Sequence, residues 1–252
     1  MPQHAKTRDR RIYQRQHRET DLDCRLGTHM PLKDFVVATP RQLPVLILAD
    51  VSGSMIHESK IETLNRSISE MLRSFKELVE TDYEITVGVV TFGGFEARLH
   101  HPLAPVAGYE WRDMPAEGRT PLGHALTLAH DVLEDRAQVP SRSGKPVVVL
   151  ASDGIPTDEW EEPLQRLLLS PRAGRATRFS VAIGNDIDEQ AMHVLERFAK
   201  DGAEGVIRAE NAHRIVEFFS WLTMSISQQA VSGQADFQPP PLTGRAADVV
   251  VE

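Results

Sequence analysis

Val45-Leu-Ile-Leu-Ala49-Asp50-Val-Ser-Gly-Ser54 is the stretch that decides the fold of this chain. Its first five residues form an unbroken apolar run, which is typical of a central strand buried on both faces of a parallel sheet. A polar turn follows at once. It places one carboxylate and two hydroxyls at the carboxyl edge of the sheet, where open α/β folds bind their ligands. Asp50, Ser52 and Ser54 are therefore the first candidate site residues.

Apolar runs and amphipathic helical stripes alternate from Pro44 onward. Gly93-Gly94 predicts a two-residue hairpin turn, after which the chain returns as an antiparallel edge strand. Strands separated by helices of a dozen or more residues predict a doubly wound, mostly parallel six-stranded sheet with helices on both faces, an α/β fold. The expected strands are 45–49, 85–92, 95–103, 146–151, 179–183 and 206–208, and the expected helices are 61–79, 121–133, 158–168, 188–200 and 212–228.

Two further polar positions follow from this arrangement. Thr120 is expected to cap a helix that has Pro121 at its first position, and Asp153 follows the apolar strand 146–151. Asp158, with Glu161 three residues later, is typical of a capping box that opens the next helix. The loop 104–119 is expected to hold Tyr109 and Trp111 exposed or half buried.

Composition divides the 252 residues into three parts. Residues 1–41 are expected to be a flexible basic extension, 42–228 the folded domain and 229–252 a flexible Pro-rich tail. Gly27-Thr-His-Met30 resembles the junction left by an expression vector, which leaves two native starting points open, Met1 and Met30.

Charge and cysteine content exclude several function classes. Residues 1–43 hold nine Lys and Arg against five Asp and Glu, which leaves 19 and 31 of the totals of 28 and 36 for residues 44–252, a net of −12. An acidic body argues against nucleic-acid binding. No apolar run is long enough to span a membrane, and no secretory signal is recognisable, so a cytoplasmic setting is expected. Cys24 is the only cysteine, which excludes a zinc or iron–sulfur site built on thiolates within one chain.

The three polar segments are expected to meet at one edge of the sheet. Asp50, Ser52, Ser54, Thr120 and Asp153 would then form an oxygen-only cluster, which favours a hard divalent cation such as Mg²⁺, with Mn²⁺ or Ca²⁺ as alternatives. Taken singly, each residue is also typical of a turn or a helix cap. It is their coincidence that favours a metal site.

This pattern resembles the metal-ion-dependent adhesion site of the von Willebrand factor A family, whose motif is Asp-x-Ser-x-Ser on the first loop, Thr on the second and Asp on the third. The resemblance covers residues 42–228. It implies that Ser52 and Ser54 bind Mg²⁺ through their hydroxyls, Thr120 directly or through water, and Asp50 and Asp153 mainly through water. It also implies a protein partner whose Asp or Glu completes the coordination, and no catalytic residues.

Within the family, several loops are similar to those of the bacterial TerY-type proteins associated with tellurium resistance. That resemblance implies a scaffold in a stress-response complex with a protein kinase and a PP2C-type phosphatase as partners, without nucleic acid or membrane. It rests on Leu43-Pro44-Val45, Thr91-Phe-Gly-Gly94, Arg119-Thr-Pro-Leu-Gly123, Ser152-Asp-Gly-Ile-Pro-Thr-Asp-Glu-Trp160 and the proline-rich end. The long basic front segment departs from the usual pattern of that subfamily.

Two other function classes remain open at this point. A metal-dependent phosphohydrolase of the aspartyl-phosphate kind would need an acid two residues after its nucleophile, where Ser52 stands. A phosphate-binding Gly-x4-Gly-Lys loop would need a glycine at the position of Val139, five residues before Gly144-Lys145. The other class is an interaction protein whose metal site is vestigial.

The remaining polar and aromatic residues near these loops are expected to have no direct part in the chemistry. His57, His124, His100-His101 and Arg119 are expected to be surface residues, whereas Trp160 is open between a rim contact and a core anchor.

Overall fold

The computed structural model describes residues 40–78, 81–185, 187–200 and 202–233 of the chain. The expected N-terminal extension up to residue 39, the Pro-rich tail from residue 234, Val79 and Cys24 lie outside these residues.

Within the described residues, six strands form one sheet in the order β3-β2-β1-β4-β5-β6. Five of them run parallel, and β3 pairs antiparallel with β2 at one edge. The predicted sheet is therefore confirmed, including its antiparallel edge strand. The strands are β1 Arg41–Asp50, β2 Tyr83–Gly93, β3 Glu96–Pro105, β4 Val147–Ser152, β5 Thr177–Ile183 and β6 Val206–Ala209.

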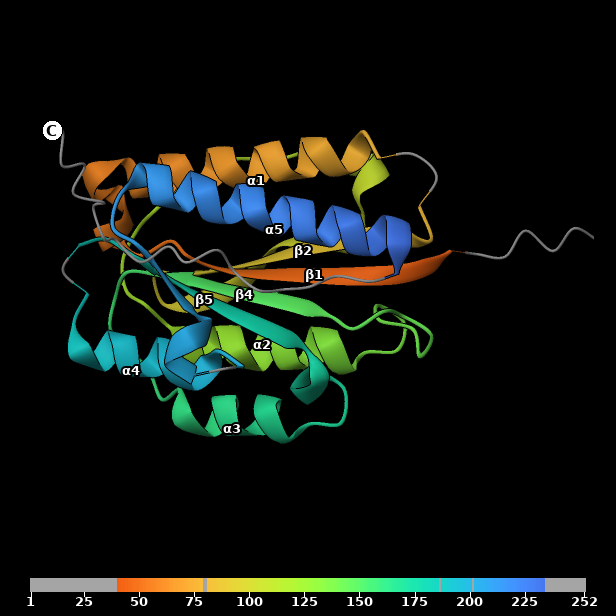
Figure 1. The fold of residues 1–252 in the computed structure, drawn as a ribbon. Coiled ribbons are helices and arrows are strands. Elements are labelled where there is room, and N and C mark those ends of the chain that lie inside the picture. The colour runs from red at the N-terminus through yellow and green to blue at the C-terminus, as the bar shows by residue number, and fades with distance from the viewer. Residues whose placement is uncertain (1–39, 79–80, 186, 201, 234–252) are drawn as a thin grey trace, which may run out of the picture. The chain divides into compact units, whose positions relative to one another are not determined.

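Helices cover both faces of the sheet, as expected. Figure 1 shows α1 and α5 on one face and α2, α3 and α4 on the other. Within the described residues, no helix combines the length and the apolar character needed to cross a membrane. The helices are α1 Lys60–Lys76, α2 Leu122–Glu134, α3 Glu161–Leu169, α4 Glu189–Phe198 and α5 Ala212–Ser232.

The apolar run in β1 is buried from both sides. Val45 and Ile47 point into the core beneath α1 and α5, whereas Leu46 and Leu48 point into the core beneath α2, α3 and α4. Successive side chains of a strand alternate between faces, so only a run without polar interruptions can satisfy both cores. This is the reason why β1 takes a central place in the sheet.

The hairpin between β2 and β3 turns one residue later than predicted. Gly93 still pairs with Glu96 in the ladder, so Gly94 and Phe95 form the turn. Gly94 adopts a positive φ of 66°, which favours glycine. The expectation that Gly93-Gly94 would be the turn was wrong, because pairing extends to the end of the strand and only Gly94 needs the left-handed backbone.

Tyr109 lies in the core rather than at the surface, which corrects the prediction for the loop 104–119, whereas Trp111 is half buried as expected. Tyr109 is only 2% exposed. Two side chains of α1 hold this loop: Lys76 donates to the carbonyl of Tyr109, and Asn65 exchanges two hydrogen bonds with the backbone of Met114, at 2.9 and 3.1 Å. These long-range polar contacts cannot be predicted from local composition.

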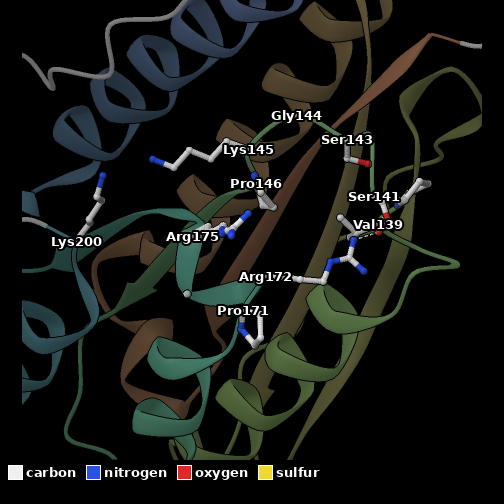
Figure 2. Close-up of a pocket in the computed structure, with 12 residues that line it drawn as sticks. Val139, Ser141, Ser143, Gly144, Lys145, Pro146, Pro171, Arg172, Arg175 and Lys200 are labelled. Carbon is white, nitrogen blue, oxygen red and sulfur yellow. Dashed lines mark hydrogen bonds between the residues drawn. The ribbon is translucent and has the colours of Figure 1, made fainter.

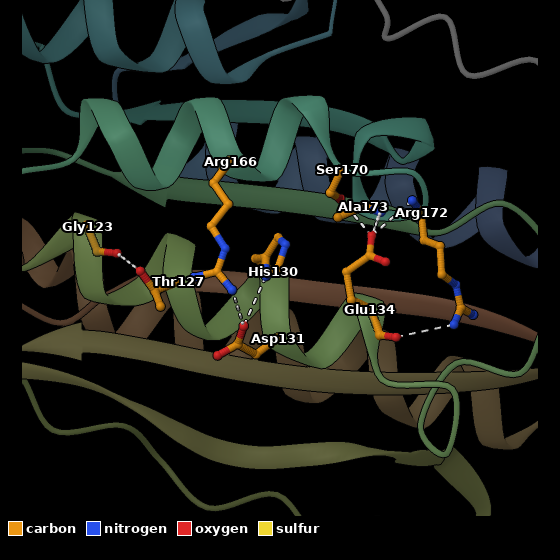
Figure 3. Close-up of polar contacts among 9 residues, drawn as sticks. All are labelled: Gly123, Thr127, His130, Asp131, Glu134, Arg166, Ser170, Arg172 and Ala173. Atoms are coloured by element: carbon orange, nitrogen blue, oxygen red, sulfur yellow. Dashed lines mark hydrogen bonds and ion pairs between the residues drawn. The ribbon is translucent and has the colours of Figure 1, made fainter.

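A polar seam joins the end of α2 to the turn after α3 (Figure 3). The Glu134 carboxylate accepts hydrogen bonds from Ser170 Oγ at 2.6 Å and from the backbone N–H groups of Arg172 and Ala173, both at 2.9 Å. Burial raises the pKa of Glu134, but these three hydrogen bonds together with the nearby His130 lower it more, so the net shift is downward. One carboxylate therefore fixes the turn that follows α3.

Candidate functional site

Asp50 is fully buried at the carboxyl end of β1, beside the end of β4. The order of the strands reverses between β1 and β4, which is where open α/β sheets form their binding crevice. Asp50 Oδ1 accepts from the backbone N–H of Ser52 at 2.8 Å, and Oδ2 accepts from Ser152 Oγ at 2.5 Å. Burial raises the pKa of Asp50 to about 6, although these hydrogen bonds oppose the shift.

A chain of hydroxyls leads from the first loop to the third. Ser54 Oγ donates to Asp153 Oδ1 at 2.6 Å, and Ser52 Oγ lies 2.9 Å from Ser54 Oγ. Because the single proton of Ser54 is used on Asp153, Ser52 is the donor to Ser54. Ser52 is buried and Ser54 is exposed, so this row of oxygens runs from the interior to solvent.

Thr120 reaches the same place from the second loop. A Cβ added at Gly154 would lie 3.4 Å from Thr120 Oγ1 and 3.9 Å from Ser54 Oγ, so both hydroxyls border the backbone next to Asp153. The backbone of Thr120 exchanges two hydrogen bonds with Thr157, at 2.9 and 3.1 Å. All five candidate residues therefore lie together, on three loops that are far apart in the sequence.

Two contributors to the cluster were not predicted from the sequence. Ser152 directly holds Asp50, and Lys60 Nζ pairs with Asp153 Oδ2 at 2.8 Å. Lys60 returns to the site because Glu58 and Ser59 both adopt a left-handed backbone with φ of 54°. Left-handed non-glycine residues are costly and concentrate near functional sites. A pair of them has no signature in the sequence, so this ion pair is visible only in the structure.

The N-terminus of α2 is capped by a side chain from another loop. Asp158 Oδ1 and Oδ2 accept from the backbone N–H groups of Gly123 and His124, at 2.9 and 3.0 Å. The expected cap by Thr120 is therefore wrong, since no side chain preceding α2 caps it. The expected capping box of Asp158 with Glu161 is wrong as well, because α3 begins at Glu161 with Trp160 before it.

Asp158→Ala is expected to reduce the free energy of unfolding by about 1 kcal/mol, because α2 loses its cap. It is also expected to weaken the binding of Mg²⁺ several-fold, since Thr120 is held against the loop that carries Asp158. Asp188→Ala is the matched control, because Asp188 caps α4 by accepting from Gln190 N–H at 2.7 Å. Thermal unfolding with and without Mg²⁺ separates the two variants. Equal Mg²⁺ responses would contradict the coupling between cap and site.

Backbone contacts between glycines align the loops around the site. Gly53 N–H donates to the carbonyl of Gly118 at 3.0 Å, Gly94 N–H donates to Glu117 at 2.8 Å, and Arg119 N–H donates to Gly94 at 3.2 Å. A Cβ at Gly118 would lie 2.6 Å from Gly94 Cα, and Gly118 has a positive φ of 70°. Only glycine permits this approach. The hairpin tip and the loops that follow β1 and precede α2 therefore form one continuous surface.

The donor set suits a hard divalent cation. It consists of carboxylate and hydroxyl oxygens, which Mg²⁺ prefers. In the part of the chain that the structure describes, no group of three His, Cys, Asp and Glu side chains could hold a metal. Hydroxyls of Ser52, Ser54 and Thr120 would therefore have to complete such a site. The raised pKa of Asp50 is consistent with this donor set. The hydrogen bonds to Asp50 only partly offset the cost of burying its charge, and a nearby cation would stabilise the ionised carboxylate.

His57, His124 and Arg119 are exposed, as expected, and the Arg119 guanidinium carbon lies 5.9 Å from the centre of the Phe95 ring. His100 and His101, which were expected to be surface residues, are half buried, because the ring of His101 stacks on the buried Tyr109. Trp160, left open by the sequence, is partly buried against the core beneath α2, α3 and α4, with Arg197 over its ring at 4.9 Å.

Residues 45–155 match the family model of the von Willebrand factor type A domain. The matched segment runs from β1 to the loop after β4 and contains all five residues of the cluster. The match covers less than half of the chain, so it shows that this segment is similar to the von Willebrand factor type A domain. No curated protein matches the chain significantly.

Several solved structures share the fold of this chain. A von Willebrand factor type A protein from Catenulispora acidiphila is 20% identical with a TM-score of 0.57, covering 74% of this chain and 42% of that one. The pilus adhesin SpaC from Lactobacillus rhamnosus GG is 13% identical with a TM-score of 0.61, covering 75% and 30%. Proximal thread matrix protein 1 from the mussel byssus is 15% identical with a TM-score of 0.54, covering 75% and 48%. The chain spans less than half the length of each. At these identities the likeness concerns the fold alone.

Proposed function

We propose that this chain is a Mg²⁺-dependent protein-binding module that captures a carboxylate of its partner. The observation that carries the proposal is the apolar surface around the oxygen cluster. Ile56, Phe95 and Ile155 are 55%, 82% and 42% exposed, and they project from the first loop, the hairpin tip and the third loop. Exposed apolar side chains that surround a polar site are typical of a surface that binds another protein.

The rigidity of this surface favours a protein partner. The hairpin tip that carries Phe95 is joined by backbone hydrogen bonds to the loop before α2, which in turn contacts the first loop through Gly53 and Gly118. Arg119 packs over Phe95, although both side chains are exposed. A surface that is ordered before binding loses less conformational entropy when a partner docks.

The polar cluster would supply the specific contact at the centre of this surface. A bound Mg²⁺ would offer the partner's Asp or Glu a coordination position. The chain's own part is to hold Ser52, Ser54 and Thr120 on one wall, to fix Asp50 through Ser152, and to balance the charge of Asp153 with Lys60. Ser54 is exposed, so the cluster is open to solvent on that side.

The resemblance of the loops to those of the TerY-type proteins suggests which proteins the domain binds. The TerY-like loop sequences support a cytoplasmic bacterial stress-response or tellurite-resistance complex, in which a protein kinase and a PP2C-type phosphatase are the candidate partners. The domain acts by binding and does not itself catalyse a reaction. Mn²⁺ and Ca²⁺ are the alternative ions.

Ser52→Ala combined with Ser54→Ala is expected to abolish the stabilisation of the protein by Mg²⁺ and the capture of its partner. Both losses follow because two hydroxyl ligands are removed from the cluster. Isothermal titration of Mg²⁺ measures the first effect. The second is measured by capture from a lysate of the source organism with the full chain immobilised, in Mg²⁺ and in EDTA.

Phe95→Ser tests whether the apolar surface contacts the partner. It is expected to weaken capture while leaving the affinity for Mg²⁺ unchanged, since Phe95 holds no ligand. Met224→Ser is the matched control, because Met224 is 65% exposed on α5, away from the loops. Capture that survives EDTA, or that responds equally to the two serine variants, would rule out the proposed docking surface.

A further inference from the structure

A basic pocket lies at the opposite edge of the sheet from the oxygen cluster, and Figure 2 shows the residues that line it. It has a volume of about 540 Å³ and is formed by the segments before β4 and before β5 together with Lys200 after α4. Because β4 has six residues, about 20 Å of strand separates this edge from Asp50. A cavity of this size falls within the range of about 300–1,000 Å³ that is usual for small-molecule sites.

Positive charge is concentrated in this pocket. Lys145, Arg172, Arg175 and Lys200 line it, and none of the described residues that line it is acidic. The surrounding chain is acidic, with 36 Asp and Glu against 28 Lys and Arg. Figure 2 shows Lys145 and Lys200 extending toward each other from opposite walls. Like charges that converge in a cavity repel one another, and a bound anion would relieve that repulsion.

Hydrogen bonds hold one of these cationic side chains in place, whereas two others are exposed. Arg172 donates to the carbonyls of Glu134 and Val139, and Glu134 also fixes the backbone of the same turn (Figure 3). Arg175 and Lys200 are exposed, and no ion pair to another described residue occupies them. The pocket thus combines one anchored guanidinium with an arginine and a lysine that are available to a ligand.

The remaining walls supply hydroxyl and apolar contacts. Ser143 Oγ is inaccessible to solvent and has no hydrogen-bond partner among the described residues. Val139, Pro140, Pro146 and Pro171 form apolar walls beside the cations. Ser143-Gly144-Lys145 lacks the first glycine of a nucleotide-binding loop, yet the fold places all three residues in the lining of this pocket.

We propose that this pocket binds a small phosphorylated molecule with at least two negative charges, such as a diphosphate. Guanidinium groups match the geometry of phosphate oxygens, whereas ammonium groups add charge without fixed orientation. Arg172, Arg175 and Lys200 already carry more positive charge than a single carboxylate would compensate. The apolar walls offer contacts to an organic body attached to the phosphates, so free diphosphate and a nucleoside diphosphate are the two sources to distinguish.

Isothermal titration of the full chain with pyrophosphate and with ADP tests the proposal. EDTA is present and ionic strength is held constant, so that the oxygen cluster takes no part. We expect saturable binding with a Kd below about 1 mM. Tighter binding of ADP would assign an organic ligand that uses the apolar walls, and equal binding would assign the diphosphate alone.

Arg175→Gln combined with Lys200→Gln is expected to weaken this binding about tenfold or more, because charge-assisted hydrogen bonds are lost. Arg142→Gln is the matched control: Arg142 is an exposed cation of the same loop that does not line the pocket. Its affinity should change less than about twofold. No saturable binding of either probe at about 10 mM, or an equal loss in the control variant, would overturn the proposal. The titration with pyrophosphate and ADP does not involve the oxygen cluster, so a failure of the partner-capture experiment would not change its result.

Discussion

Asp50→Asn is expected to make the metal-free protein more stable while it abolishes stabilisation by Mg²⁺. Burial raises the pKa of Asp50 from 3.8 to about 6, so its ionised form is costly in the folded chain. Each pKa unit corresponds to about 1.4 kcal/mol, so the neutral amide gains up to about 3 kcal/mol near pH 7. The amide retains the geometry, since its oxygen accepts from Ser52 N–H and its nitrogen donates to Ser152 Oγ.

The dependence on pH has a defined sign. Between about pH 4 and pH 6 folded Asp50 retains a proton that the unfolded chain releases, so the free energy of unfolding falls as the pH rises through this window. Above about pH 6 the loss is complete. Asp50→Asn removes this contribution, so the difference in stability between variant and wild type should grow from pH 4 to pH 6 and then level off.

Thermal unfolding in EDTA and in Mg²⁺ measures both effects. For a domain of this size, about 3 kcal/mol corresponds to a rise in Tm of about 6–12 °C in EDTA. At a Mg²⁺ concentration of about 100 times Kd, the wild type gains about 2.7 kcal/mol and the variant gains none. Asp188→Asn serves as the control, because Asp188 is exposed and its side chain caps α4 through Gln190 N–H. A variant that is less stable than wild type in EDTA would contradict the reasoning on burial.

Gly123→Ala is expected to destabilise the folded chain strongly, although it adds only one methyl group. An added Cβ would lie 2.0 Å from the backbone oxygen of Glu159 and 3.1 Å from Asp158 Oδ2. Backbone atoms cannot move aside as a flexible side chain can, so α2 has to shift from the loop that caps it. We expect a loss of about 3 kcal/mol, corresponding to a fall in Tm of about 6–12 °C.

The same variant is expected to weaken Mg²⁺ binding at least tenfold, because the shift separates Thr120 from Thr157. Gly108→Ala is the matched control, since a Cβ there meets nothing within 4 Å. Thermal unfolding and Mg²⁺ titration of both variants decide the matter. If Gly123→Ala unfolds at the wild-type temperature, then the close packing of α2 against the third loop does not matter for stability.

Sequence reasoning predicted the elements better than the contacts between them. The buried run of β1 and the stripe on α1 were recognisable because hydrophobic periodicity reflects burial directly. The predicted α5 ended at residue 228, whereas the helix continues to Ser232 with Ala230 still buried. The errors at Gly93-Gly94, Tyr109 and Asp158 have one origin. In each case a residue distant in the sequence supplies the partner: Glu117 for Gly94, Lys76 for Tyr109, and the start of α2 for Asp158.

The sequence by itself determined the parallel sheet and proposed Asp50, Ser52, Ser54, Thr120 and Asp153 as one site, since strand ends in such a fold converge at one edge. Only the tertiary structure decided how these residues are held: Ser152 beneath Asp50, Lys60 on Asp153, and Asp158 on α2. It also decided that Lys145 and Lys200 share a pocket. Local patterns record which side chains are buried, whereas hydrogen bonds and ion pairs between distant segments depend on the packing of the whole chain.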